Sequence, residues 1–313
     1  MIEQVSLKLL PSQADNEPAI TQAAAAALSV SPNAITGFHV LKRSIDARSK
    51  QVYFMLTLKV FVNEPFHERE KFIPIYERLA SAAPVAIVIG AGPAGLFAAL
   101  HLIEAGIKPI VLERGKDVRS RRRDLAALNK TGVVNPDSNY CFGEGGAGTY
   151  SDGKLYTRSN KRGDINRILS IFVHFGATEK ILYEAHPHIG TNKLPHIIVA
   201  MREQIINSGG EVHFDQKVTD FIIKDNHIRG VKTVSGATFD ASQVILATGH
   251  SARDIFRLLH DKQILISAKP FALGVRVEHP QELIDSAQYH CAVRGEHLPP
   301  ASYSLVEQVD GRG

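Results

Sequence analysis

The chain has 313 residues, of which 44% are hydrophobic and 22% charged, and its formal net charge at pH 7 is +4. This composition is typical of a soluble globular protein with a sizeable core, and the length suffices for two domains. The excess of 36 basic over 32 acidic residues is too small to indicate nucleic-acid binding by itself.

Cys141 and Cys291 are the only cysteines, and they form no C-x-x-C pair. This argues against a disulfide scaffold, a zinc site and a redox dithiol, so any redox chemistry is expected on a bound cofactor, and we expect no metal site. The first residues lack the basic and apolar regions of a signal peptide. We therefore expect a cytoplasmic protein.

The first 64 residues indicate a small β-α-β-β domain. Alternating apolar residues predict a strand at Val5–Leu9, alanine-rich sequence predicts a helix over Gln22–Leu28, and β-branched and aromatic runs predict strands at Phe38–Ile45 and Gln51–Val62. The next segment, Glu64–Ala83, carries Phe72, Ile75 and Leu79 at helical spacing. It is therefore predicted to be a connecting helix that Pro84 closes.

A βαβ pattern follows, and it organises the rest of the chain. The apolar run Val85–Ile89 predicts a buried parallel strand, and Gly90, Gly92 and Gly95 after it have the G-x-G-x-x-G spacing. An apolar helix pattern ends near Gly106, and a second strand ends in Glu113, 113 − 95 = 18 residues after the last glycine. A carboxylate at this place binds the ribose of a dinucleotide.

Two other interpretations of the pattern are weaker. A βαβ unit that binds nothing leaves Glu113 unexplained. A membrane-spanning helix is suggested because Val85 to Ile103 carries no Asp, Glu, Lys or Arg, yet three glycines and Pro93 interrupt the run.

Two stretches after Glu113, one basic and one rich in glycine, could contact a ligand. The basic run Arg119–Arg123 is more typical of a solvated helix face than of a phosphate clamp. The stretch Cys141–Leu155 holds too many glycines for a stable helix or strand, and it suits backbone that lies against a flat ligand. A flexible surface loop is the alternative, which the flanking aromatic residues disfavour.

The remaining pattern predicts alternating helices and strands. Helices are expected over Asp164–Phe175, Thr191–Asn207 and Ile255–Leu259, short strands over Glu211–Val234, and further strands at Val244–Gly249, Phe271–Val277 and Ala301–Glu307.

In this order the pieces resemble the bacterial FAD-dependent dehydrogenase (NAD(FAD)-utilizing dehydrogenase-like) family of the glutathione-reductase-like flavoproteins. The resemblance covers nearly the whole chain. It rests on Gly90–Gly95 with Glu113-Arg114-Gly115, and on the strings at 143–155, 187–194, 247–254 and 270–280. The implied fold class is α/β: a small β-α-β-β domain at 1–64, a connecting segment at 65–84, a Rossmann-like FAD-binding domain at 85–261, and the start of a substrate domain at 262–313.

The resemblance also implies which residues bind the cofactor. The turn would hold the FAD pyrophosphate, Glu113 the adenosine ribose, and the backbone of Val218 the adenine. The glycine-rich loop would lie along the flavin, and the segment after the later strand would close the nucleotide site. The full set is Gly90, Gly92, Pro93, Ala94, Gly95, Glu113, Arg114, Gly145, Gly146, Ala147, Gly148, Thr149, Val218, Ala247, Thr248 and Gly249.

Flavin chemistry needs few protein groups, because the cofactor performs the redox step. His188 is a candidate acid–base residue and Lys154 a candidate stabiliser of reduced flavin, although a structural histidine and a surface lysine are the ordinary alternatives. No second G-x-G-x-x-G follows a strand. NAD(P)H as electron donor would therefore bind transiently.

Three functions fit these observations: an FAD-dependent oxidoreductase of an unidentified small molecule, which we favour; a flavoprotein acting on RNA; and a non-catalytic FAD-binding or partner module. Nucleic acid is the less expected partner, and the pattern indicates no membrane partner.

The last residues suggest an interrupted hairpin. Asp310-Gly311 is a two-residue turn signal after the predicted strand Ala301–Glu307, and the sequence stops two residues later. The expectation is a truncated substrate domain and a chain that alone holds FAD weakly or substoichiometrically. The flavin-to-protein ratio of the purified chain measures this.

Overall fold

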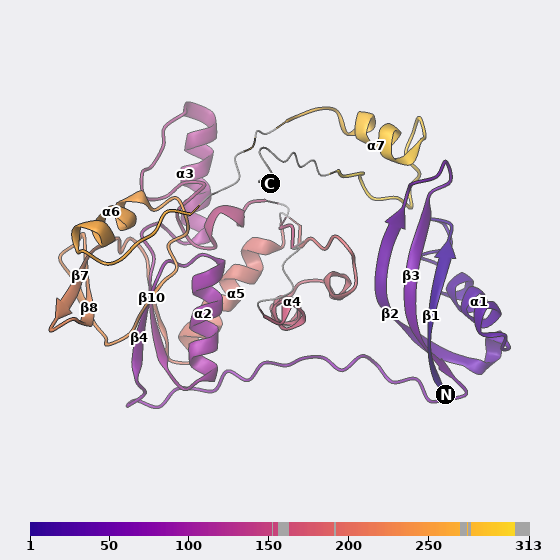
Figure 1. Ribbon diagram of the computed structural model, residues 1–313, viewed down its shortest axis with the longest axis horizontal. Helices are drawn as coiled ribbons and strands as arrows, with labels where there is room; N and C mark the ends of the chain where they lie inside the picture. Colours follow the sequence, from indigo (N-terminus) through magenta and orange to yellow (C-terminus); the bar gives the residue numbers. More distant parts are fainter. Residues whose placement is uncertain (152, 156–162, 191, 270–273, 275–276, 304–313) are drawn as a thin grey trace. The chain divides into compact units, whose positions relative to one another are not determined.

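The computed structural model describes residues 1–151, 153–155, 163–190, 192–269, 274 and 277–303 (Figure 1). The chain forms two compact units. The first comprises Met1–Lys71, Leu182–Pro187 and Ala268–Gly313, and the second comprises Phe72–Ile181 and His188–Ser267. Within the described ranges, no helix has the length and apolar character needed to cross a membrane.

The first unit is built on a three-stranded antiparallel sheet. Its strands β1 (Ile2–Leu9), β2 (Ile35–Asp46) and β3 (Tyr53–Val62) lie in the order β1-β3-β2, and α1 (Glu17–Leu28) covers one face. Alternate residues of β3, among them Leu56, Leu58 and Val60, are buried in the core with Ile20 and Ala24 of α1. The predicted β-α-β-β arrangement is confirmed.

Later parts of the chain join this first unit. Helix α7 (Gln281–Tyr289) carries Asp285, whose buried carboxylate accepts a hydrogen bond from Ala301 N at 2.8 Å. Tyr289 and Ala301 pack against Val52 in a small apolar cluster. The sequence did not predict this packing. The assignment of 262–313 to a substrate domain stays a prediction. Residues 304–313, which carry the hairpin signal, lie outside the described residues, and so do most residues of the strand expected at 271–277.

The connecting helix predicted over Glu64–Ala83 is wrong, because residues 63–84, between β3 and the strand β4 (Val85–Ile89), form neither helix nor strand. Pro74 in the middle of this segment lacks an N–H donor and disfavours helical backbone at Ile73. Tertiary contacts hold the extended segment instead: Leu79 N donates to Ser208 O at 2.9 Å, and the Ser208 hydroxyl donates to Tyr76 O at 3.3 Å.

The second unit contains the parallel sheet. Its order is β10 (Val244–Leu246), β4 (Val85–Ile89), β5 (Lys108–Leu112) and β6 (Glu211–His213), with every neighbouring pair parallel. A separate antiparallel sheet follows β6. Its strands are β7 (Val218–Lys224), β8 (His227–Thr233) and β9 (Thr238–Asp240).

In the described part of this unit, the sheets are accompanied by the α-helices α2 (Pro93–Glu104), α3 (Val118–Thr131), α4 (Ile165–His174), α5 (Leu194–Asn207) and α6 (Arg253–Asp261). Helix α2 packs against β4, β5 and α5 (Figure 1). All but the first residue of β4 are buried, as expected of a strand covered on both faces. The predicted α/β class with a Rossmann-like βαβ unit is confirmed.

The turn between β4 and α2 depends on its glycines. A Cβ atom on Gly95 would lie 1.8 Å from Gly90 O, so the helix approaches the strand as closely as backbone allows. Gly90 itself has φ +105°, a left-handed value that favours glycine. The sequence therefore specifies this turn through both positions.

Gly95→Ala is expected to lower the free energy of unfolding by more than about 2 kcal/mol, because the new methyl group overlaps the Gly90 carbonyl. Gly295→Ala is the matched control, since its Cβ would meet no atom within 4 Å. The control is expected to stay within about 0.5 kcal/mol of the parent chain. Urea denaturation measures both, and equal midpoints for the two variants would contradict the close approach.

Candidate cofactor site

The predicted cofactor residues gather at one edge of the parallel sheet. Gly90, Glu113 and Ala247 each come directly after a strand, β4, β5 and β10 respectively. The strand ends are tied together, since Gly90 N donates to Leu112 O at 2.8 Å and Ala247 N to Ile89 O at 2.9 Å. The carboxyl edge of a parallel sheet is where α/β proteins bind nucleotides.

The first turn of α2 lies at this edge and suits an anion. Gly92 is the N-cap residue, no side chain caps the helix, and Pro93 occupies its first turn. The N–H groups of Ala94 and Gly95 have no acceptor inside the helix because they belong to its first turn. Such N–H groups and the helix dipole attract phosphate, so this turn fits a pyrophosphate.

Glu113 connects three parts of the site. Its carboxylate is buried and accepts hydrogen bonds from Ala91 N at 2.8 Å, Gly115 N at 2.9 Å and Gly143 N at 3.0 Å. A carboxylate has about four lone-pair sites, so one remains for a ligand. The predicted ribose contact stays a prediction, and the structure adds a structural role to it.

The glycine-rich loop lies directly on the α2 turn. Gly145 N donates to Ala91 O at 2.8 Å, and a Cβ atom on Gly92 would meet Gly146 Cα at 3.8 Å. Gly145 and Gly146 have left-handed φ values of +79° and +70°. The described residues of the loop form no helix or strand beyond a short 3-10 turn at Gly146–Gly148 and an isolated bridge at Lys154, in agreement with the prediction of irregular backbone. The backbones of two glycines, Gly92 and Gly146, thus face each other where the pyrophosphate is expected.

Arg121 holds this loop, and the solvated helix face predicted for residues 119–123 is wrong at this one position. Its side chain is 1% exposed, whereas Arg119, Arg122 and Arg123 are exposed. The guanidinium donates to Glu144 O at 2.7 Å and to Asn139 O at 2.9 Å. Burial lowers the pKa of this guanidinium from its usual value.

Thr149 belongs to the same buried network. Its hydroxyl accepts a hydrogen bond from Arg121 Nη1 at 3.0 Å and lies 3.0 Å from Glu144 O. Because these partners are all protein groups, the hydroxyl stabilises the loop. Its predicted cofactor contact stays a prediction.

Glu144 is the most deeply buried carboxylate of the site. It is 0% exposed, and its Oε2 accepts from Val118 N at 2.7 Å and from Arg202 Nη1 at 3.1 Å. Burial raises the pKa of Glu144 to about 7, although the Val118 N–H and the charge of Arg202 act in the opposite direction. The group therefore titrates near neutrality.

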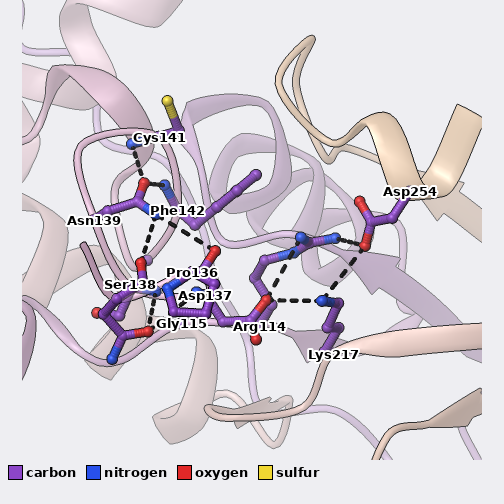
Figure 2. A network of polar contacts seen from close by, with 12 residues as sticks. Arg114, Gly115, Pro136, Asp137, Ser138, Asn139, Cys141, Phe142, Lys217 and Asp254 are labelled. Atoms are coloured by element: carbon purple, nitrogen blue, oxygen red, sulfur yellow. Dashed lines mark hydrogen bonds and ion pairs between the residues drawn. The ribbon is translucent and has the colours of Figure 1, made fainter. Parts of the chain in front are cut away.

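Arg114, the residue after Glu113, belongs to a cluster of four charges (Figure 2). Arg114 Nη2 lies 2.6 Å from Asp254 Oδ2, and Lys217 Nζ lies 3.0 Å from Asp137 Oδ1. The Arg114 guanidinium also stacks on Phe142, 4.3 Å from the ring centre. Burial opposes ionisation of Asp254, but the hydrogen bond and charge of Arg114 lower its pKa overall. The cluster brings together four distant segments at the end of the site where the adenosine is expected.

The other predicted cofactor residues flank these groups. The backbone of Thr248 approaches Gly90, whose Cβ would lie 3.4 Å from Thr248 Cα, and Gly249 follows with φ +69°. Val218 begins β7, and its side chain is buried with Ile89 and Leu112. Its predicted contact with adenine through the backbone is not tested by this packing.

The two candidate catalytic residues are brought together. Lys154 and His188 form an antiparallel β-bridge, and the neighbouring Ile189 N donates to Gly153 O at 3.0 Å. Both residues are exposed. Residues 153–154 of the glycine-rich loop and residues 188–189 are thus neighbours in space, and the catalytic roles stay predictions.

Three family models match separate parts of the chain. Residues 82–131 match an FAD binding domain, residues 270–313 match the C-terminal domain-like region of FAD-dependent proteins, and residues 1–61 match a domain of unknown function. The first match covers β4, α2, β5 and the whole of α3. The two FAD matches support FAD as the cofactor.

A protein of Clostridium beijerinckii, described as uncharacterized, is 37% identical in an alignment of 297 residues that covers 90% of this chain. The chain spans 55% of the length of that relative. Among solved structures, THI4 of Thermovibrio ammonificans is 17% identical with a TM-score of 0.39, over 58% of this chain and 63% of that one. The 3-ketosteroid-delta4-(5alpha)-dehydrogenase of Rhodococcus jostii RHA1 is 15% identical with a TM-score of 0.31, over 55% of this chain and 48% of that one.

Several residues of the site escaped prediction. Glu144 stands between two glycines. A carboxylate in such a loop is a usable sequence signal for a structural anchor, because the glycine-rich backbone of the loop has few other side chains to hold it. Arg121 lies in a basic run that gives no sign of burial. Lys217, Asp137 and Asp254 are distant in sequence and carry no local signal of their pairing. Among the described residues, no group of His, Cys, Asp and Glu has the arrangement of a metal site.

Glu113→Gln is expected to destabilise the protein by about 1–3 kcal/mol, because the amide nitrogen of Gln cannot accept the hydrogen bonds that a carboxylate oxygen accepts. Glu203→Gln on the exposed face of α5 is the matched control and is expected to change stability little. Chemical denaturation measures both variants. Equal stability of the two would show that the buried carboxylate does not support the site.

Proposed function

We propose that this chain binds FAD non-covalently at the carboxyl edge of its parallel sheet, as part of an FAD-dependent oxidoreductase that acts on a small molecule. One observation carries the proposal. Residues from the α2 turn, the end of β5, the glycine-rich loop and the end of β10, assigned to FAD from sequence, lie together around an uncapped helix N-terminus. The resemblance to the bacterial FAD-dependent dehydrogenases supports the same function.

The site suggests an orientation for the dinucleotide. The pyrophosphate would lie at the first turn of α2, and the adenosine would lie toward Glu113 and the four-charge cluster of Arg114, Asp137, Lys217 and Asp254. The two acidic residues of the cluster balance its two cations, and Glu113 adds a further negative charge. An unphosphorylated ribose fits this charge pattern better than a 2′-phosphate does.

Bound FAD would supply the hydride or electron transfer. This chain would supply position and charge: the α2 turn binds the phosphates, and the glycine-rich loop offers backbone to the flavin part. Lys154 would contribute a positive charge and His188 an acid–base group from two bridged segments outside the strands. NAD(P)H is proposed as the electron donor, bound transiently.

The chain is expected to bind added FAD, and Gly92→Val is expected to weaken that binding at least about tenfold, because branched carbons beyond the Cβ would fill the space between Gly92 and Gly146. Gly295→Val is the matched control, since it faces no atom within 4 Å. Flavin fluorescence titration measures the affinities, and mass analysis of heat-released ligand identifies what co-purifies. Release of FMN or NAD in place of FAD, or equal affinities for the two variants, would contradict the proposal.

A further inference from the structure

Glu144 joins three elements around the glycine-rich loop. Its backbone N–H donates to Lys116 O at 3.0 Å, before α3 begins. Its carboxylate binds Val118 N at the start of α3 and Arg202 on α5, at 2.7 and 3.1 Å. Gly145, the next residue, is hydrogen bonded to the fingerprint turn through Ala91 O at 2.8 Å. The position of the loop on the α2 turn therefore depends on Glu144.

One oxygen of this carboxylate lacks a partner. Oε1 of Glu144 is buried without a hydrogen bond to any described residue, although the whole side chain is 0% exposed. An ionised carboxylate with an unpaired buried oxygen is costly, whereas its protonated form is tolerated there. The rise of the Glu144 pKa to about 7 by burial expresses the same cost.

The charged groups near Glu144 lie on α5, at and before the start of α3, and directly after β5. Arg202 approaches from α5 and Arg121 from α3, while Asp117 caps α3 and Glu113 directly follows β5. Tyr150, whose pKa burial raises, stays neutral near pH 7. Two cations thus face three carboxylates when Glu144 is ionised, and the group is balanced when Glu144 is protonated. An anionic ligand at the adjoining turn favours the protonated state.

We propose that Glu144 is a positioning residue of the FAD site, which anchors the glycine-rich loop and takes up one proton when the dinucleotide binds beside that loop. This inference rests on the proposed function. The proton comes from solvent and forms an O–H bond on the carboxylate of Glu144, at Oε1, the oxygen without a partner. No electron is transferred, and no other bond of the protein breaks.

The linkage has a definite sign. If binding takes up a proton, the affinity for FAD falls as pH rises above the pKa of the free protein, by up to about tenfold per pH unit. Fluorescence titrations of the full chain at intervals from pH 6 to pH 8.5 are expected to show this fall. Glu144→Gln mimics the protonated form and is expected to bind FAD with little dependence on pH. Glu203→Gln, the exposed control, is expected to follow the parent chain.

A second measurement needs no FAD. In the folded state Glu144 holds its proton to a higher pH than in the unfolded chain, so its contribution to stability is present at low pH and is lost as pH rises through about 7. The denaturation midpoint of Glu144→Gln relative to the parent chain is therefore expected to rise between pH 5 and pH 8. Because all other titrating groups are the same in the two proteins, their effects cancel in the difference between the two midpoints.

The outcomes separate the two proposals. A pH dependence of FAD affinity that persists unchanged in Glu144→Gln overturns the role of Glu144 and leaves FAD binding standing. Absence of FAD binding at every pH overturns the proposed function and the proton uptake with it. A constant stability difference between variant and parent chain contradicts titration of Glu144 near neutrality, whether or not FAD binds.

Discussion

The arrangement of the site depends on the buried carboxylate of Glu113. It accepts backbone hydrogen bonds from the α2 turn, from the segment after β5 and from the glycine-rich loop. In the described residues, no other side chain accepts hydrogen bonds from all three of these segments. Charge-assisted hydrogen bonds of this sort are stronger than neutral ones. One side chain at the end of β5 thereby holds together the backbone surfaces on which a dinucleotide would lie.

The glycine-rich loop needs such polar support because it has few side chains of its own to pack. Arg121 donates to its carbonyl oxygens, Glu144 fastens it to α3 and α5, and the Thr149 hydroxyl closes it from within. A loop with an ordinary apolar core would carry side chains that project toward the ligand. Buried ionic groups leave its ligand side as bare backbone, at the cost of desolvating two arginines and two carboxylates.

Local patterns predicted the βαβ unit well, because a buried strand, a glycine turn and a helix each leave a periodic trace within a few residues. The bounds of β4 match the predicted strand residue for residue. The segment at 63–84 was mispredicted because Phe72, Ile75 and Leu79 have helical spacing although Pro74 interrupts them. The burial of Arg121 and the pairing of Lys217 with Asp137 were beyond prediction, since they depend on contacts between segments far apart in sequence.

The path of the chain between its two units has a further consequence. The polypeptide passes from one unit to the other after Lys71, Ile181, Pro187 and Ser267. The short segment 182–187 belongs to the first unit, where it forms a parallel β-bridge with Arg43 of the edge strand β2. The N-terminal sheet therefore also contacts later parts of the chain, although its family match ends at residue 61. A protease cut in the segment at 64–84 would not by itself remove the contacts of the N-terminal sheet with residues 182–187 and 278–303, and a gene fusion that exchanged residues 1–64 would have to supply new partners for both.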